Sequence, residues 1–264
     1  MAYHLSAAKL QTYHRCAQAY YFRYERSIHR PTFFGSASLG TALHQALAQV
    51  YRDWHYQAPR PEWEWMEQCW VQQTQGLNPS QIAEGEAILR QYYNSFIANQ
   101  TAIARPLAVE GRIQGQLQVE NLEFTLSGRY DRLDWLPEGL ELIDYKSTKE
   151  VKQPDPIEVD LQIGLYYLAL EQKYPQNLKR LSLIYLRTGQ QVSFEVTPEH
   201  KQQVEAQISQ LALRLRTEQA WEPAPGGQCD RCTYARYCPA IKTEPDPLPQ
   251  DAKPEPGLQL VLGL

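Results

Sequence analysis

The chain has 264 residues, of which 43% are hydrophobic and 21% charged, a composition typical of a globular protein with a sizeable core. No apolar run approaches the roughly 20 residues of a membrane span and no signal-peptide core opens the sequence, so we expect a cytoplasmic protein without a membrane partner. The net charge of −4 still permits a nucleic-acid ligand, because residues 1–60 carry seven Lys or Arg against two Asp or Glu and could follow a phosphate backbone.

Helical periodicity dominates the first hundred residues. The spacing of apolar side chains predicts helices over residues 6–25, 38–56, 62–73 and 79–100. Ser6 and Asn78 are the expected N-caps of the first and the last of these helices. The two helices within residues 62–100 have the character of an insertion that packs over a neighbouring element.

From residue 107 onward the hydrophobic period changes to two. Strands are predicted over 107–119, 122–133 and 140–145, followed by a helix over 157–172, strands over 180–186 and 191–196, and a helix over 198–219. Strands in a run, then a crossover helix and another strand, indicate a mixed α/β sheet flanked by helices. The proline-rich, acidic residues 243–264 are expected to be disordered.

The hairpin within residues 128–146 carries charges that a core strand would avoid. Asp131 lies on its first strand, and Asp144 and Lys146 end the second. Side chains alternate along a strand, so Asp144 and Lys146 point to one face and Tyr145 to the other. Carboxylates brought together beside a lysine suit metal-assisted hydrolysis of a phosphodiester. The alternative is a hairpin with solvated charges at its ends.

Three cysteines crowd into ten residues near the C-terminus. Cys229, Cys232 and Cys238 have the spacing of a metal site, and a chain of this size with five cysteines does not resemble a secreted disulfide scaffold. Three thiolates need a fourth ligand, for which Cys16 and Cys69 remain. Spacing alone does not separate a zinc site from an iron–sulfur cluster.

Taken together, these features resemble the core of the PD-(D/E)XK nucleases, in their RecB-type branch, from about residue 5 to residue 239. The motifs that carry the resemblance, in chain order, are Gly40 with His44, the run Gly128 to Asp134 with its Asp-Arg-x-Asp sequence, Asp144-Tyr145-Lys146 after an apolar triplet, and Gln162 with Tyr166. The resemblance implies a restriction-endonuclease-like core in a single nuclease domain over residues 1–242.

The resemblance also implies a catalytic centre. Its expected ligands for one or two Mg²⁺ or Mn²⁺ ions are His44, Asp131, Asp144 and the carbonyl of Tyr145, with Glu110 as a further candidate. Lys146 would orient the attacking water or stabilise the transition state. Gln162 and Tyr166 would pack their helix on the sheet and contact the substrate or support Lys146. Taken singly, His44 would more often be a core histidine and Glu110 a solvated strand residue.

Iron–sulfur members of this branch join one cysteine of the first helix to three near the C-terminus. The resemblance therefore implies a 4Fe–4S cluster held by Cys16 and the three cysteines of residues 226–240, with a zinc site as the alternative. The sequence predicts that Cys69 is a buried helix cysteine. Asp134 is expected to be structural, because alternation places it on the opposite face from Asp131.

The expected activity is a metal-dependent deoxyribonuclease, acting as an exonuclease on single-stranded DNA or DNA ends in repair or recombination. One alternative is a DNA-binding or nuclease subunit of a larger repair or CRISPR adaptation complex, with a helicase as one such partner, inactive alone. Another is a zinc-stabilised binding module. The segment 259–262 resembles the peptide that docks on the bacterial sliding clamp, although Gly263 stands where an aromatic residue is expected. The alternative for this segment is an unspecialised end.

Overall fold

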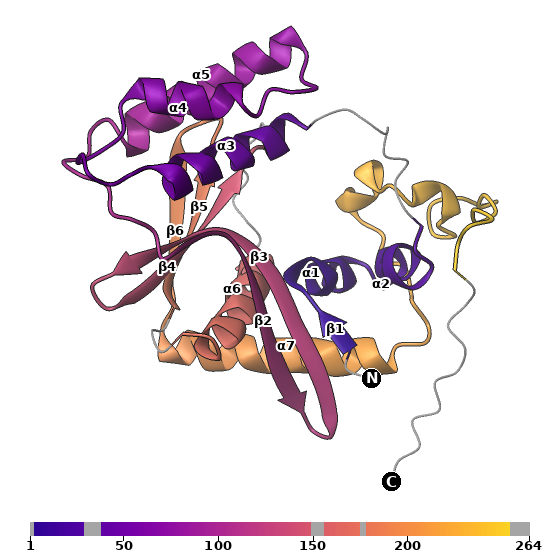
Figure 1. Ribbon diagram of the computed structural model, residues 1–264. Helices are drawn as coiled ribbons and strands as arrows, with labels where there is room; N and C mark the ends of the chain where they lie inside the picture. The colour runs from indigo at the N-terminus through magenta and orange to yellow at the C-terminus, as the bar shows by residue number, and fades with distance from the viewer. Residues whose placement is uncertain (1–2, 29–37, 149–155, 175–177, 254–264) are drawn as a thin grey trace.

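A mixed β-sheet forms the centre of the computed structural model, which describes residues 3–28, 38–148, 156–174 and 178–253 (Figure 1). The strands are β1 (Tyr3–Leu5), β2 (Ala108–Val119), β3 (Leu122–Leu136), β4 (Gly139–Lys146), β5 (Leu178–Tyr185) and β6 (Gln190–Glu195). Their order is β1-β3-β4-β5-β6, and β2 pairs with β3 as well. The β1–β3 and β4–β5 pairs are parallel and the others antiparallel, which confirms the predicted mixed sheet.

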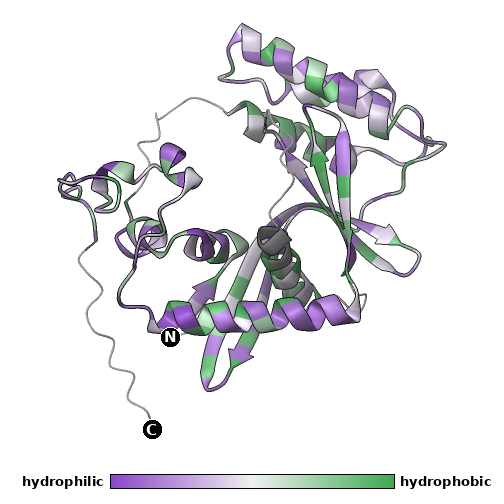
Figure 2. Cartoon of the chain, turned by 180° about the vertical axis from the view of Figure 1, so that it is seen from behind, coloured by the Kyte–Doolittle hydropathy of each residue, from purple (hydrophilic) through white to green (hydrophobic). Residues whose placement is uncertain are grey.

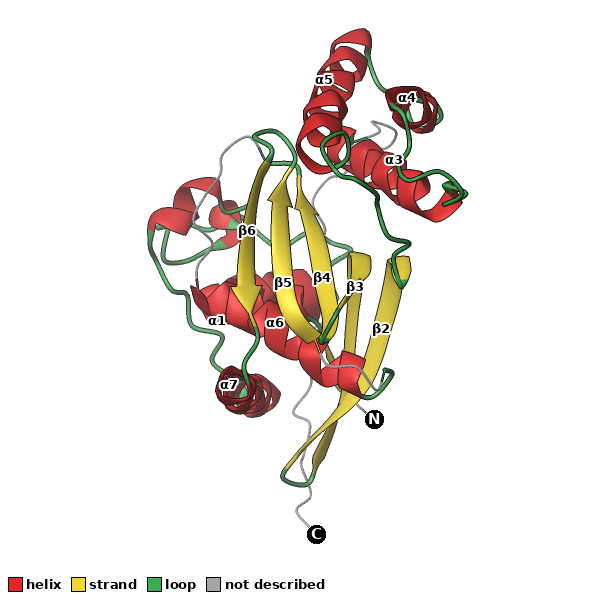
Figure 3. Cartoon of the chain, turned by 90° about the vertical axis from the view of Figure 1, so that its left-hand side faces the viewer, coloured by secondary structure: helices red, strands yellow, loops and turns green. Residues whose placement is uncertain are grey.

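Helices cover both faces of this sheet (Figures 1 and 3). They are α1 (Ala7–Arg15), α2 (Ala17–Tyr20), α3 (Leu39–Asp53), α4 (Trp63–Val71), α5 (Pro79–Phe96), α6 (Pro156–Glu171) and α7 (Pro198–Thr217). A π-helical turn (Tyr21–Glu25) follows α2, and two short 3₁₀ turns (Gly227–Arg231 and Ala235–Tyr237) follow α7. The described helices and strands therefore form the predicted sheet flanked by helices.

Two hydrophobic cores lie on opposite faces of the sheet because successive strand side chains alternate between them. Leu142 of β4 packs with α1, α6 and α7, whereas its neighbour Ile143 packs with α3, α4 and α5. The same alternation is visible as bands of hydrophobic and hydrophilic residues along β2 and β3 (Figure 2). The predicted helical insertion over residues 62–100 corresponds to α4 and α5, which pack together with α3.

The predicted helix over residues 6–25 is wrong in one respect, because it breaks at Cys16. This residue has extended backbone angles (φ −167°, ψ 113°), and α2 and the π-helical turn follow it. The extended residue brings its thiol against a distant segment, where the Ala224 amide donates to Cys16 Sγ at 3.5 Å. The predicted caps are confirmed: the side chains of Ser6 and Asn78 accept hydrogen bonds from the backbones of Lys9 and Gln81.

The C-terminal segment from residue 243, which was expected to be disordered, is described as far as residue 253. The described part of this segment follows the 3₁₀ turns and ends against the region after α2, where Arg26 Nε donates to the Lys253 carbonyl at 2.6 Å and the Lys253 amide donates to the Arg26 carbonyl at 2.9 Å. The segment 259–262, with its resemblance to a clamp-binding peptide, lies outside the described residues. Among the helices that the structure describes, none is both long and apolar enough to span a membrane.

Candidate active site

Asp131 of β3 links a helix to the neighbouring strand through both of its carboxylate oxygens. His44 Nδ1, from α3, lies 3.0 Å from Asp131 Oδ1, and the backbone amide of Tyr145 on β4 donates to Asp131 Oδ2 at 2.6 Å. The β3–β4 pairing and the packing of α3 on the sheet thus hold the carboxylate in one orientation. Three of the predicted site residues meet here.

Glu110 joins this group through an unusual backbone conformation. The pairing of β2 with β3 on either side of Glu110 places it across from Asp131, and its φ of +50° lies in the left-handed region that non-glycine residues rarely adopt. Such conformations are costly and concentrate at functional sites. Ligand atoms of His44, Glu110 and Asp131 lie within 4.8 Å of one another, the one such group of three or more His, Cys, Asp or Glu side chains in the described chain.

Asp144 and Lys146 share one face of β4, as strand alternation predicts. Lys146 Nζ lies 2.5 Å from Asp144 Oδ2, and Gln162 Nε2 of α6 donates to Asp144 Oδ1 at 3.1 Å. Asp144 lies outside the group of three ligands in this arrangement. Its Oδ2 atom is buried and, although Lys146 is close, it has no hydrogen bond of regular geometry. A buried carboxylate oxygen in this condition is an available ligand for a cation.

Tyr166 supports the backbone beside the site. Its hydroxyl donates to the Arg129 carbonyl, two residues before Asp131, and burial raises the pKa of Tyr166 so that the phenol remains a donor. The ring takes the space above Gly128, where a Cβ atom would lie 2.7 Å from it. A glycine is therefore needed at position 128, because the Tyr166 ring occupies the space that a side chain would take. Tyr166 lies on α6, one helical turn from Gln162.

Three nearby carboxylates raise the pKa of His44. Burial lowers the pKa of His44, but the hydrogen bond and charge of Asp131, followed by the charges of Asp144 and Glu110, outweigh burial and raise it above its ordinary value of 6.5. Negative charge therefore accumulates at this point, which is the condition that favours a bound cation. Carboxylate oxygens with one imidazole form a ligand set that suits Mg²⁺ and also accepts Mn²⁺.

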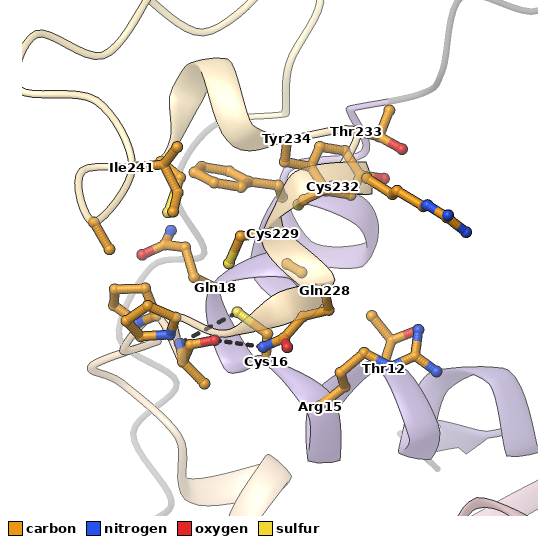
Figure 4. Close-up of a pocket in the computed structure, with 18 of the residues that line it drawn as sticks. Thr12, Arg15, Cys16, Gln18, Gln228, Cys229, Cys232, Thr233, Tyr234 and Ile241 are labelled. Carbon is orange, nitrogen blue, oxygen red and sulfur yellow. Dashed lines mark hydrogen bonds between the residues drawn. The ribbon is translucent and has the colours of Figure 1, made fainter. Parts of the chain in front are cut away.

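The four predicted cluster cysteines lie around one cavity, apart from the acidic group. Cys16, Cys229, Cys232 and Cys238 line one cavity of about 710 Å³ between the first helices and the C-terminal turns (Figure 4). The Gly226 amide donates to Cys229 Sγ at 3.4 Å. Burial raises the pKa of Cys232, and the three other cysteines raise it further, as expected of neighbouring thiols.

The spacing of these sulfurs bears on what they could hold. No three of the four cysteine sulfurs lie within 4.8 Å of one another. A tetrahedral zinc ion with bonds of about 2.3 Å would place its sulfur ligands about 3.8 Å apart. The fifth cysteine, Cys69, is buried in α4, as predicted.

A family model of the PD-(D/E)XK nuclease superfamily matches residues 4–239. The chain belongs to the PD-(D/E)XK nuclease superfamily. It is therefore a phosphodiester-cleaving nuclease of a superfamily that uses divalent metals, and the mixed sheet with flanking helices is its restriction-endonuclease-like core. The acidic group that includes His44 lies within the matched residues.

Two solved structures also resemble this PD-(D/E)XK nuclease. One is a protein from Eubacterium rectale assigned as an exonuclease, with 12% identity, a TM-score of 0.48, and coverage of 93% of this chain and 91% of that one. The other is the protein SSO0001, with 16% identity, a TM-score of 0.40, and coverage of 89% and 96%. The comparison with curated protein sequences gives no significant match.

One member of this nuclease's motif has a role that the sequence did not indicate. Arg132, between the two aspartates of the Asp-Arg-x-Asp run, is 8% exposed and therefore buried. Asp134 binds its guanidinium group, which agrees with the expected structural role of Asp134. Hydrophobic periodicity and residue spacing do not predict a buried arginine, because arginine is almost always at the surface.

Proposed function

We propose that this nuclease is a Mg²⁺- or Mn²⁺-dependent deoxyribonuclease of the RecB-type branch, an exonuclease that acts on single-stranded DNA or DNA ends in repair or recombination. The observation that supports the proposal most directly is the convergence of His44, Glu110 and Asp131 beside the Asp144–Lys146 pair. These side chains come from α3, β2, β3 and β4, so the fold brings together groups that are far apart in the sequence.

His44, Glu110, Asp131 and Asp144, with the Tyr145 carbonyl, would hold one or two divalent ions. A divalent ion in such a site lowers the pKa of water and neutralises negative charge that develops on phosphorus. Lys146 would donate a hydrogen bond to the attacking water or to a phosphate oxygen in the transition state. Gln162, already bonded to Asp144 Oδ1, would keep that carboxylate in place while Lys146 exchanges its partner for the substrate.

Arg129 is a candidate contact for the DNA phosphate. Its side chain is 65% exposed, and its Nη2 atom lies 3.2 Å from Glu110 Oε2. A cation that takes the Glu110 carboxylate as a ligand would compete with this ion pair and leave the guanidinium for a phosphate oxygen, which it can bind in bidentate fashion. Tyr166 fixes the backbone of Arg129 during this exchange through its hydrogen bond to the Arg129 carbonyl.

For the cysteine site we propose a 4Fe–4S cluster held by Cys16, Cys229, Cys232 and Cys238. The proposal is supported by one cavity that all four cysteines line, and a zinc ion is the alternative occupant. Such a cluster would tie the first helices to the C-terminal turns. Anaerobically purified protein should then absorb near 400 nm and contain iron and acid-labile sulfide, and Cys16→Ser should lose both. Colourless protein with stoichiometric zinc would contradict the cluster.

Digestion of end-labelled DNA tests the proposed activity. Single- and double-stranded oligonucleotides labelled at either end should be shortened progressively with Mg²⁺ or Mn²⁺, and should be stable with EDTA. Asp131→Ala should stop the reaction. Glu123→Ala, an exposed carboxylate on the same strand, is the matched control and should cleave normally. Metal-dependent DNA binding without cleavage by the isolated chain would favour a subunit that acts only within a larger complex.

A further inference from the structure

In the described part of the chain, Arg132 is the one charged side chain that is buried. It lies on β3 immediately after Asp131, so strand alternation sends it to the opposite face from the acidic group. That face carries the hydrophobic core formed with α3, α4 and α5. A positive charge in this position needs compensation from every side, because removing an ion from water carries a penalty of several kcal/mol.

The guanidinium group of Arg132 has hydrogen-bond partners for each of its three nitrogen atoms and an aromatic ring against one face. Arg132 Nε and Nη2 bind Asp134 Oδ1 and Oδ2 at 3.0 and 2.9 Å, and Nη1 donates to the hydroxyls of Tyr92 and Tyr145 at 3.1 and 3.0 Å. The Cζ atom of Arg132 lies 3.9 Å from the centre of the Tyr51 ring. Burial raises the pKa of the Tyr92 and Tyr145 phenols, so both remain neutral acceptors.

Stability alone does not account for this arrangement. A buried ion pair is often no more stabilising than well-packed hydrophobic residues of the same volume. What the arginine provides is direction, because a planar guanidinium fixes its partners at set angles. Its three tyrosine partners come from three elements other than its own strand: Tyr51 from α3, Tyr92 from α5 and Tyr145 from β4.

Tyr145 connects this network to the acidic group. Its side chain binds Arg132 on one face of the sheet, while its backbone amide donates to Asp131 Oδ2 at 2.6 Å. Its ring also meets the His44 ring edge to face, with centroids 5.9 Å apart and planes at 90°. A shift of Tyr145 would therefore move a hydrogen bond of one expected ligand and the packing of another.

We propose that Arg132, held by Asp134, is the positioning residue of the metal centre, acting through Tyr145 on Asp131 and His44. The inference rests on the metal site put forward above and adds a residue that contacts neither metal nor substrate. Partners that orient metal ligands in this way typically change metal affinity by about 10–100-fold when they are replaced. The guanidinium fork, and not the positive charge alone, is what this role requires.

Mn²⁺ titration without DNA, by calorimetry or electron paramagnetic resonance, tests the proposal. Arg132→Lys keeps the charge and removes the fork, so it should bind Mn²⁺ about 10–100-fold more weakly than the parent. Arg132→Met should lose at least as much affinity. Cleavage by Arg132→Lys should need correspondingly more Mn²⁺ for half-saturation, with kcat at saturating metal close to the parent value.

Two further variants keep the test decisive. Tyr145→Phe removes the hydroxyl that meets Arg132 and keeps the ring beside His44, so it should weaken Mn²⁺ binding even if the Arg132 variants fail to fold. Tyr93→Phe removes a buried hydroxyl bonded to the Pro61 carbonyl in the same helical layer, and should bind like the parent. A parent protein that binds no Mn²⁺ would overturn the metal centre itself. Parent-like affinity in a folded Arg132→Lys, or in Tyr145→Phe, would overturn only the positioning role.

Discussion

Lys146 Nζ approaches Asp144 Oδ2 to 2.5 Å on one face of β4, so a cationic side chain and an expected metal ligand are partners of each other. The ammonium group of Lys146 compensates the negative charge of this carboxylate. The pairing also means that cation binding by Asp144 and release of Lys146 toward the substrate would be the same event. The lysine would then become available only in a protein that carries metal.

Lys146→Met should separate metal binding from cleavage. Loss of one donor to the transition state typically lowers kcat by about 10²–10³-fold, and we expect at least this loss. Mn²⁺ affinity should stay the same or increase, because the variant removes the cation that competes for Asp144. Parallel Mn²⁺ titration and cleavage assays check both parts, and weaker Mn²⁺ binding in the variant would contradict the competition. Lys201→Met, which removes a half-buried ion pair with Glu171, serves as the control.

The charge of His44 should make the metal-free protein sensitive to pH. Because Asp131, Asp144 and Glu110 raise the pKa of His44 against the effect of burial, the protonated form is favoured by folding. This contribution is fully present below the unfolded value of 6.5 and is lost as the pH rises through the raised folded value. The melting temperature in EDTA should therefore fall across this window, and His44→Gln should flatten the profile.

Mn²⁺ affinity should change in the opposite direction over the same pH window. Metal binding by imidazole requires the neutral ring, so affinity increases as His44 loses its proton. Calorimetric titrations at several pH values measure the increase. A pH-independent affinity in the parent protein would show that His44 is not a ligand.

Gly128→Ala should destabilise the fold by pressing on Tyr166. The added Cβ atom would lie 2.7 Å from the Tyr166 ring and 3.2 Å from Ile113, and overpacking of this kind costs about 1–3 kcal/mol. Urea unfolding measures the loss. Tyr166→Leu in the Gly128→Ala background should recover part of it, which a double-mutant cycle would detect as a coupling. Strictly additive effects would mean that the contact is relieved elsewhere.

Arg129→Ala should weaken DNA binding mainly when a cation is bound. Removing one phosphate contact lowers the slope of log K against log salt by about 0.7–0.9. Fluorescence anisotropy with EDTA and with Ca²⁺, a hard cation that prefers oxygen ligands, should show the larger defect with Ca²⁺, because only then is Glu110 taken from Arg129. Arg180→Ala breaks a comparable surface ion pair with Glu195 and should bind DNA normally.

The sequence predicted most elements because their signals are local. The change of hydrophobic period at residue 107, the caps at Ser6 and Asn78 and the alternation at Asp144 and Lys146 all depend on near neighbours, and the structure agrees with each. The strand β1 was missed because three residues are too short for a periodic pattern and its partner on β3 lies far away in the sequence. The break at Cys16 was not predicted, because no proline or glycine lies near it in the sequence.

The candidate site was predictable by residue type but not by arrangement. His44, Asp131 and Lys146 stand out because each sits in a recognisable motif. Glu110 approaches Asp131 with a positive φ, and a glutamate in a predicted strand is not expected to adopt such a backbone conformation. Arg132 was overlooked for a related reason: its role comes from hydroxyl and ring contacts supplied by α3, α5 and β4, and only the folded chain brings these together.

The contacts of Arg132 also bear on how the molecule unfolds. If α5 separated from the sheet, Tyr92 would leave and a guanidinium group in an apolar layer would lose a partner and gain no water until the layer opened completely. Local opening of these helices is therefore penalised, and we expect the amides of α3 and α5 to exchange hydrogen together with those of β3 and β4 as one cooperative unit. Although α5 belongs to the predicted insertion, it supplies Tyr92 to the contacts of Arg132 and is thereby tied to the sheet.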